Sequence, residues 1–222
     1  MSAGAPTVFV VDDDSSLRRG LGRLLRSAGW NVETFASARE FLERAAYAGT
    51  GCVMVDVRMP GMTGPELQAQ MAARGMSLPV VFLTGYCDLA TGIRAMKMGA
   101  VDFLVKPVDD ETLLQTIRQA VERHATHQVK QRQHQHISER LLRVSPRERE
   151  VLQLVIAGHP NRRIADKMGI SLKTVKVHRA RVMDKMQVRS VAELVHLCET
   201  VGMGMAQRAW DLGPIVPTSA RT

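Results

Sequence analysis

Polar side chains of three kinds, carboxylate, hydroxyl and ammonium, follow four strand-like segments, and together they could perform chemistry. Each follows a short run of apolar, mostly β-branched residues: Asp12, Asp13 and Asp14 after Val8–Val11, Asp56 after Cys52–Val55, Thr84 after Val80–Leu83, and Lys106 after Val101–Val105. The carboxyl ends of parallel strands lie at one edge of a sheet, which is where open α/β sheets bind ligands. The sequence therefore predicts an acidic pocket around Asp56, with a hydroxyl and an ammonium group beside it to receive an anion.

Three carboxylates in one pocket repel one another unless a cation binds among them. Mg²⁺ meets this need, because it is a hard ion that takes oxygen ligands and keeps several waters. With the charge neutralised, Asp56 can attack a phosphoryl group, since carboxylates act as nucleophiles in aspartyl-phosphate chemistry. Lys106 and the metal would balance charge on the phosphoryl oxygens. Thr84 would donate its hydroxyl to one of them, a contact made only after modification that can bias a conformational equilibrium.

The elements that must hold these residues alternate along the first half of the chain. A weaker strand, Asn31–Phe35, is expected near the edge of the sheet. Helical patterns lie between the strands and begin near Ser15, Ser37, Gly64–Pro65, Asp88 (to Met98) and Asp109. Five strands alternating with five helices predict a doubly wound α/β fold, with a parallel five-stranded sheet covered by helices on both faces. One strand-end polar residue is common on any surface, but four at matching ends favour a site.

Charge and composition separate the two halves of the 222-residue chain. Residues 1–121 hold 12 Lys+Arg and 13 Asp+Glu, and residues 122–222 hold 18 and 9, which gives net charges of −1 and +9. The basic half is therefore expected to meet a polyanion, although a solvated basic surface is the alternative. We expect no membrane span and no signal peptide. The three scattered cysteines suggest reduced thiols in a cytoplasmic protein.

A polar segment rich in Gln, His and Arg connects the halves. It contains no proline or glycine, so the fifth helix is expected to continue through it as a semi-rigid linker. Its four histidines, His124, His127, His134 and His136, do not have the spacing of a zinc site and are expected to be solvated. The predicted organisation is residues 1–122 as the first domain, 123–143 as the linker, 144–202 as an all-α domain of four helices, and 203–222 as a partly disordered tail.

The all-α domain has the pattern of a helix-turn-helix. Ser145 and Glu148 form a predicted capping box, Asn161 is expected to cap the next helix, and Ser171 and Ser190 are expected to cap the two that follow. In such a motif the second helix, here Leu172–Met186, reaches the bases. The candidates for DNA contact are Lys173, Thr174, Lys176, Val177, His178, Arg179 and Arg181, with Arg162 and Arg163 from the preceding helix.

These candidates divide by chemistry. Lys176 can donate to guanine and Val177 can touch a thymine methyl group. Arg162, Arg163, Lys173, Arg179 and Lys185 are expected to contact phosphates, which gives salt-dependent binding without sequence preference. The alternative is a solvated basic helix packed on a core.

The first half resembles the receiver domain of two-component response regulators over about Thr7 to Glu122. The matching segments are Val11–Asp14, Val55–Gly64, Leu83–Gly85 and Gly99–Pro107. The resemblance implies a flavodoxin-like fold in which Asp56 is the phosphoacceptor and a sensor histidine kinase is the donor. It also implies that Asp13, Asp56 and the main-chain carbonyl of Arg58 bind Mg²⁺, while Asp12 holds a metal-bound water. Thr84 and Phe103 would form the switch pair, and the Lys106–Pro107 bond would be cis.

The second half resembles the LuxR-type domain, and the whole chain is similar to response regulators of the NarL/FixJ family, nearer FixJ. The matching segments include Ser145–Leu152, Gly158–Asn161 and Thr174–Met183. This implies a regulator that binds double-stranded promoter DNA, works with RNA polymerase and becomes a homodimer on phosphorylation. A face carrying Ile93, Met96 and Met98 is the candidate dimer surface, although these could be core residues.

Two other classes of function use some of the same residues. An aspartyl-phosphate phosphatase or phosphotransferase needs an acid/base carboxylate two residues after the nucleophile, and Arg58 occupies that position, so we expect no enzyme beyond the receiver's own phosphotransfer and dephosphorylation. The other alternative is a DNA-binding protein whose receiver no longer uses phosphate. Every expected pocket residue is present, which disfavours it, and DNA affinity with and without phosphorylation would separate the two.

Overall fold

The computed structural model describes residues 5–85, 96 and 99–203. These residues belong to two compact units, and the division between the units falls between Val129 and Lys130. The first unit holds two core clusters and the second holds one. In the part of the chain described, no helix combines the length and apolar composition needed to cross a membrane.

The first unit is built on a parallel five-stranded sheet. Its strands are β1 (Thr7–Val11), β2 (Asn31–Phe35), β3 (Gly51–Asp56), β4 (Val80–Thr84) and β5 (Asp102–Val105), in the order β2-β1-β3-β4-β5. This is the predicted doubly wound sheet, and the weaker strand β2 lies at its edge. The order of connection reverses between β1 and β3, so the ligand crevice expected in this fold lies at the carboxyl ends of those two strands.

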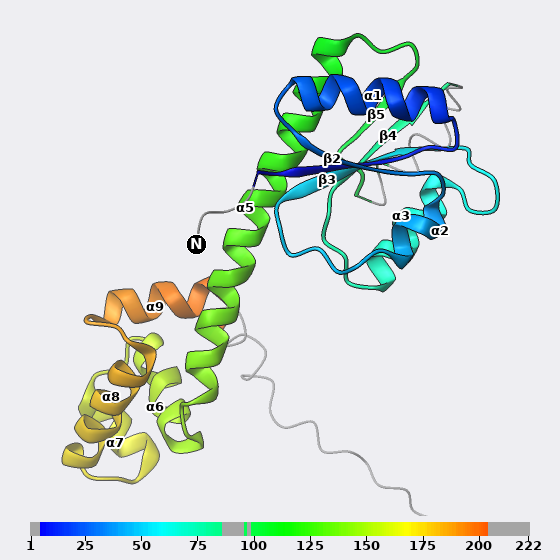
Figure 1. Cartoon of the computed structure of the whole chain (residues 1–222). Helices are drawn as coiled ribbons and strands as arrows, with labels where there is room; N and C mark the ends of the chain where they lie inside the picture. Colours follow the sequence, from blue (N-terminus) through cyan, green and yellow to red (C-terminus); the bar gives the residue numbers. More distant parts are fainter. Residues whose placement is uncertain (1–4, 86–95, 97–98, 204–222) are drawn as a thin grey trace, which may run out of the picture. The chain divides into compact units, whose positions relative to one another are not determined.

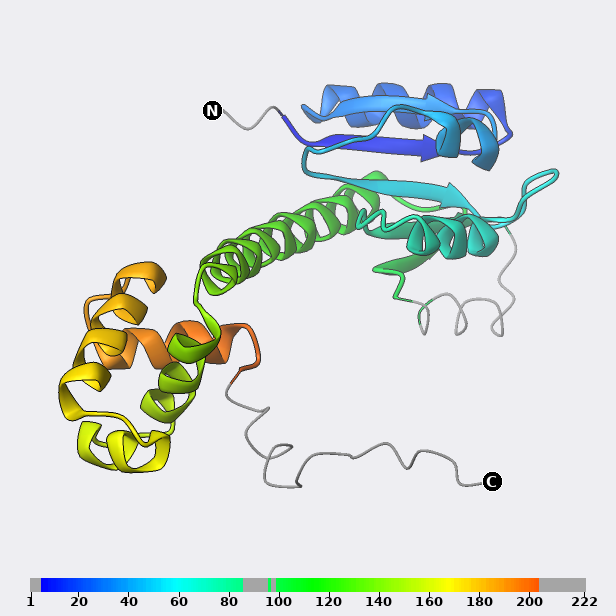
Figure 2. The same ribbon diagram turned by 90° about the horizontal axis from the view of Figure 1, so that it is seen from below.

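Alternate residues of the inner strands enter two cores, one on each face of the sheet. On one face Phe9, Val53 and Phe82 pack with residues of α2 (Ala38–Glu43) and α3 (Gly64–Ala73). On the other face, Val8 and Met54 pack with residues of α1 (Ser15–Ser27) and of α5 (Asp110–Leu142). Figures 1 and 2 show α1 and α3 on opposite sides of the sheet.

Local sequence signals explain where these helices begin. Asp14 caps α1 by accepting hydrogen bonds from the N–H groups of Ser16 and Leu17 at 2.7 and 3.2 Å. Thr63 and Glu66 form a capping box at the start of α3. The predicted helix Asp88–Met98 lies outside the described residues except for Met96, which is helical.

The second unit contains the last turns of α5 and four further helices, α6 (Pro146–Ile156), α7 (Asn161–Met168), α8 (Leu172–Met186) and α9 (Val191–Thr200). Helix α5 is continuous over 33 residues, as the absence of proline and glycine predicts. The predicted caps at Ser145, Ser171 and Ser190 are present. The predicted cap at Asn161 is wrong: Pro160 occupies the cap position without a side-chain bond, because Asn161 is already helical and its side chain binds elsewhere.

Two of the three cysteines lie among the described residues. Cys52 and Cys198 are free and buried, and burial raises the pKa of the Cys52 thiol to about 12. Both thiols are therefore protonated and unreactive at neutral pH. Cys87 lies outside the described residues.

Candidate functional sites

An ion-pair cluster occupies the carboxyl edge of the sheet. The ammonium group of Lys106 lies 2.7 Å from Asp56 Oδ1 and 2.9 Å from Asp12 Oδ2, and both carboxylates are largely buried. The other oxygen of Asp56 accepts a hydrogen bond from the Arg58 N–H at 2.7 Å. The other oxygen of Asp12 accepts one from the Asp14 N–H at 2.8 Å. Every oxygen of the two carboxylates thus has a donor, as buried charges require.

Strand register brings these residues together. Val11 of β1 pairs with Val55 of β3, so the residues that follow, Asp12 and Asp56, emerge side by side. Lys106 is held at the end of β5 by its N–H, which donates to the Thr84 carbonyl at 2.7 Å, and the Lys106–Pro107 bond is cis as predicted. Gly64 completes the site, because a Cβ there would lie 2.5 Å from the Asp56 carbonyl oxygen.

The electrostatics of the cluster favour a charged lysine. Burial by itself would lower the pKa of Lys106. The hydrogen bonds that its ammonium group donates to Asp56 and Asp12, together with the negative charges of those carboxylates, outweigh burial and hold that pKa above its ordinary value. The ammonium group therefore neutralises part of the charge that the two carboxylates concentrate at this edge.

The remaining predicted pocket residues take different positions. Thr84 ends β4 and is buried, with 2% of its surface exposed. The Phe103 ring is half-buried and packs against Phe82, with 6.2 Å between ring centroids. Asp13 follows Asp12 but is exposed, and so is Arg58. The structure therefore joins Asp12, Asp56 and Lys106 directly, and leaves Asp13 at the rim.

A metal is chemically compatible with this edge. Among the described residues, no group of three or more His, Cys, Asp or Glu side chains is placed to hold an ion. Mg²⁺, however, needs only one or two carboxylates because it keeps several waters. The buried pair Asp12 and Asp56, with oxygen ligands only, fits that requirement.

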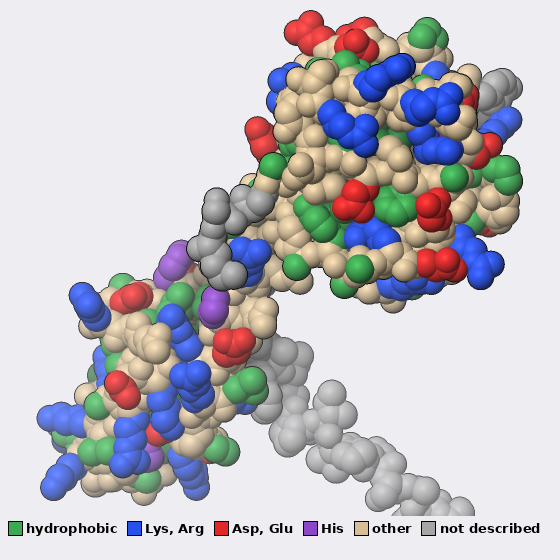
Figure 3. Space-filling view, in the orientation of Figure 1, with side chains coloured by type: hydrophobic (Ala, Val, Ile, Leu, Met, Phe, Trp, Pro, Cys, Tyr) green, Lys and Arg blue, Asp and Glu red, His purple; other side chains and the backbone are tan. Residues whose placement is uncertain are grey.

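The second unit presents a basic surface over α7 and α8, where Lys and Arg side chains gather (Figure 3). Two groups of candidates differ in exposure. The exposed ones are Arg162, Arg163, Lys173, Lys176, Val177 and Arg181. Val177 has 43% of its surface exposed although it is apolar, whereas Val175 and Val182 of the same helix are fully buried. The exposed face of α8 is therefore the one that carries the predicted base-reading residues.

The other candidates are partly covered or engaged within the unit. Thr174 and His178 are half-buried, and Thr174 contacts the Ser171 hydroxyl at 2.8 Å. Arg179 donates from Nη1 to Asn161 Oδ1 at 2.7 Å, which ties α8 to the start of α7. Lys185 forms an ion pair with the buried Glu148 at 2.6 Å. These bonds were not predicted, because no local pattern signals a contact between residues 18 or 37 apart.

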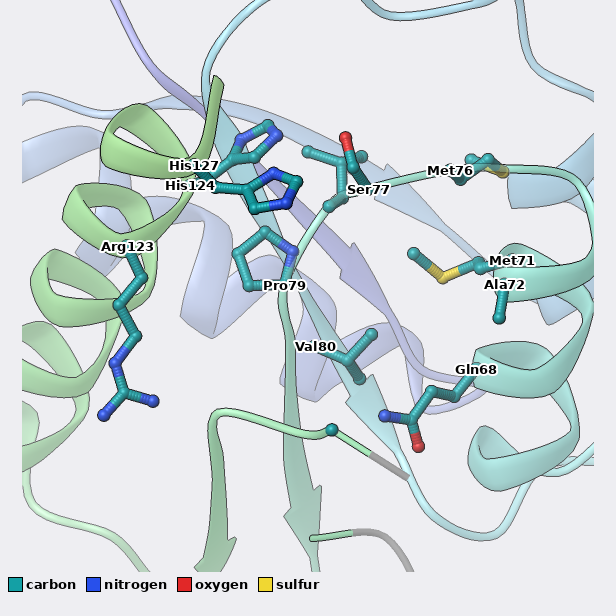
Figure 4. A pocket seen from close by; sticks show the side chains of 12 residues that line it. Gln68, Met71, Ala72, Met76, Ser77, Pro79, Val80, Arg123, His124 and His127 are labelled. Carbon is teal, nitrogen blue, oxygen red and sulfur yellow. The ribbon is translucent and has the colours of Figure 1, made fainter. Parts of the chain in front are cut away.

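One histidine contradicts the expectation that all four in the linker are solvated. His124 has 3% of its surface exposed, whereas His127, His134 and His136 are exposed. Its burial follows from helix periodicity, since it continues the buried stripe of Leu113, Ile117 and Ala120 on α5. Figure 4 shows His124 and His127 next to Ser77 and Pro79, among the residues that line a cavity. The volume of this cavity is about 450 Å³.

Comparisons with known proteins place both units. A model of the response regulator receiver domain matches residues 8–118, and a model of bacterial regulatory proteins of the luxR family matches residues 143–198. The chain is 42% identical to nodulation protein W and to the transcriptional regulatory protein FixJ, both of Bradyrhizobium diazoefficiens. Each alignment spans 196 residues and 88% of this chain, with 86% and 96% of the relatives covered.

Solved structures of response regulators are similar to this chain in both sequence and fold. The response regulator StyR superposes with a TM-score of 0.80 at 46% identity, covering 88% of this chain and 99% of StyR. Full-length FixJ from B. japonicum gives 0.56 at 40% identity, covering 91% and 99%.

Proposed function

This chain belongs to the NarL/FixJ family of response regulators, and from that membership we propose that Asp56 is its phosphoacceptor and α8 its DNA-reading helix. It is a phosphorylation-dependent transcriptional regulator of a two-component system. Response regulators work with sensor histidine kinases and bind DNA through the LuxR-type domain, and the family is not typically enzymatic.

The single observation that carries the phosphoacceptor proposal is the placement of Asp56. It is the carboxylate at the end of β3, beside the point where the sheet's connections reverse, and Lys106 contacts it at 2.7 Å. An oxygen of Asp56 attacks the phosphorus of the donor, and the bond between phosphorus and the donor breaks. Lys106 then balances negative charge on the transferred group, and the Thr84 hydroxyl donates to one of its oxygens. When Thr84 moves to make this contact, the Phe103 ring changes its packing, and the two residues act as the switch pair.

Receiver domains generally use Mg²⁺, and Asp12, Asp13, Asp56 and the Arg58 carbonyl are the groups proposed to hold it here. The metal supplies positive charge that stabilises the transferring phosphoryl group. The protein's own part is to keep two carboxylates side by side and largely buried, which concentrates the negative charge that attracts the ion.

DNA recognition is assigned to the basic surface over α7 and α8. Lys176 and Val177 on the exposed face of α8 read bases, and Arg162, Arg163, Lys173 and Arg181 contact phosphates. Phosphorylation produces a homodimer that binds paired half-sites about 10 base pairs apart and recruits RNA polymerase. Exposed Val105 at the sheet's edge strand and exposed Met96 support the dimer, whereas Ile93 and Met98 lie outside the described residues.

Phosphoryl uptake tests the assignment of Asp56. The purified full-length chain is treated with a small-molecule phosphodonor and Mg²⁺, and its mass is compared with that of Asp56→Asn and of Asp13→Asn. Wild type gains one phosphoryl group and Asp56→Asn gains none, while Asp13→Asn requires more Mg²⁺ for the same uptake. Full uptake by Asp56→Asn would show that another residue accepts the phosphoryl group.

A further inference from the structure

Side chains from two consecutive turns of α5 form hydrogen bonds with the residues at the start of β3. His124 Nδ1 accepts a hydrogen bond from the Gly51 N–H at 3.0 Å. One turn later, Gln128 Nε2 donates to the Gly49 carbonyl at 2.9 Å, and Gln128 Oε1 lies 3.4 Å from the Thr50 hydroxyl that donates to it. We name Gly49–Gly51 the β3 entry. Three successive residues of the entry are thus bonded to side chains of a single helix.

The sheet itself provides no acceptor for the Gly51 N–H. The Val53 N–H donates to the Pro79 carbonyl, just before β4 begins, and Val53 is the first β3 residue that pairs with β4. Gly51 therefore lies beyond the end of that ladder, with its other side against β1, where a Cβ would come within 2.2 Å of the Thr7 carbonyl oxygen. Gly51 is buried, and a buried N–H without a partner is costly. His124 supplies the acceptor that β4 does not.

These hydrogen bonds join the strand that carries Asp56 to the helix that continues into the second unit. β3 begins at Gly51 and ends at Asp56. α5 contributes Ile117 and Val121 to a core of the first unit and, as the same unbroken helix, Ile137 to the core of the second. We propose that His124 and Gln128 are positioning residues that couple β3 to α5, so that phosphorylation at Asp56 changes DNA affinity through this helix. The inference rests on the proposed function of Asp56.

The role requires His124 in its neutral form, because a protonated Nδ1 carries a hydrogen and cannot accept one. Burial, together with the nearby charge of His127, lowers the pKa of His124 below its ordinary value of 6.5. The nearest other polar group is the Gln128 amide, whose Nε2 lies 3.3 Å from His124 Nε2, and Arg123 and Ser77 line the same cavity. Acid should therefore break the contact only below pH 6.5, and coupling should fall as the imidazole takes up a proton.

Variants of the full-length chain distinguish the hydrogen-bond acceptor role of His124 from a role of its imidazole in packing. His124→Ala removes the acceptor, His124→Asn keeps an acceptor near the position of Nδ1 and cannot be protonated, and Gln128→Ala removes the second turn's bonds. His134→Ala is the matched control, because His134 is exposed on the same helix. Each variant is assayed for phosphoryl uptake from a small phosphodonor and for affinity to promoter DNA before and after uptake, and thermal melting checks its folding.

The inference predicts unchanged uptake in every variant. The gain in DNA affinity on phosphorylation falls about fivefold or more in His124→Ala and Gln128→Ala, in line with the loss of one hydrogen bond in the first variant and two in the second. His134→Ala keeps the full gain in DNA affinity on phosphorylation, and His124→Asn recovers it. In His124→Asn the gain in DNA affinity no longer declines as the pH falls.

Two results would overturn it. If wild type takes up phosphate and gains affinity but His124→Ala gains as much, the coupling role is wrong while the proposed function stands. If His124→Asn melts normally yet loses the gain together with His124→Ala, the imidazole acts by packing and the acceptor role is wrong. Failure of uptake in wild type would instead refute the assignment of Asp56, so the two failures are distinguishable.

Discussion

Replacing Lys106 with methionine tests the charge balance of the phosphoacceptor site. The change keeps most of the side chain's volume but removes the ammonium group that contacts Asp12 and Asp56 at 2.9 and 2.7 Å. Two largely buried carboxylates would then lie side by side with no cation between them. We expect the first unit to lose stability at neutral pH and to recover part of it in millimolar Mg²⁺, since a divalent ion can replace the missing charge.

The magnitude follows from burial. Removing one partner of a buried ion pair costs about 3–5 kcal/mol, and a hydrogen bond to a charged group contributes about 1.5–3 kcal/mol. The Lys106 side chain is 25% exposed, so solvent screens part of the interaction and we expect a loss of about 2–3 kcal/mol. Because the folded state raises the pKa of Lys106, this contribution is fully present below pH 10.5, its ordinary pKa, and disappears as pH rises through the folded value.

Urea unfolding followed by Trp30 fluorescence measures this loss. Trp30 packs against a core of the first unit, and Trp210→Phe removes the other tryptophan of the chain. With a slope of about 1–3 kcal/mol per molar urea, the midpoint should fall by about 1 M. Arg118→Met, at an exposed position of α5, is the control and should leave it unchanged. An unchanged midpoint in Lys106→Met, or equal stabilisation of both proteins by Mg²⁺, would refute the reasoning.

Three further predictions concern the second unit. The bond to Lys185 holds the pKa of Glu148 at about 2, so Glu148→Gln should cost about 2 kcal/mol in urea unfolding at pH 7, and the cost should shrink as pH falls from 4.5 towards 2; a pH-independent cost would contradict this. Arg179→Met should weaken DNA binding about fivefold with an unchanged salt slope, because Arg179 holds Asn161; a slope reduced by about one would mean that it contacts phosphate. Lys176→Ala should cost about 1–3 kcal/mol on the operator and much less on unrelated DNA, and an equal loss on both would exclude base reading.

The sequence predicted the first unit's architecture because local patterns determine it. Short runs of valine and other apolar residues are typical of strands that are buried on both faces of a sheet. The polar residue that ends each run lies at the edge of the sheet where the site is expected. Register follows once β1 and β3 pair, which places Asp56 beside Asp12. The capping residues Ser145, Ser171 and Ser190 were predictable for the same reason, since a cap depends on residues within one turn.

The errors concern contacts between distant residues. Asparagine is a favoured helix cap, but the side chain of Asn161 accepts a hydrogen bond from Arg179 of another helix. His124 lies in a polar stretch, and only its spacing from Ile117 and Leu113 reveals that it faces the core. Pattern predicts elements, whereas these partners depend on how the elements pack.

The most direct test of the account measures promoter DNA affinity of the same preparation before and after phosphorylation, at two salt concentrations, for wild type and Asp56→Asn. The account predicts that phosphorylated wild type binds at least tenfold more tightly, with a steeper salt dependence as a dimer doubles the phosphate contacts, while Asp56→Asn does not respond. Equal affinity of the phosphorylated and unphosphorylated wild type would contradict it.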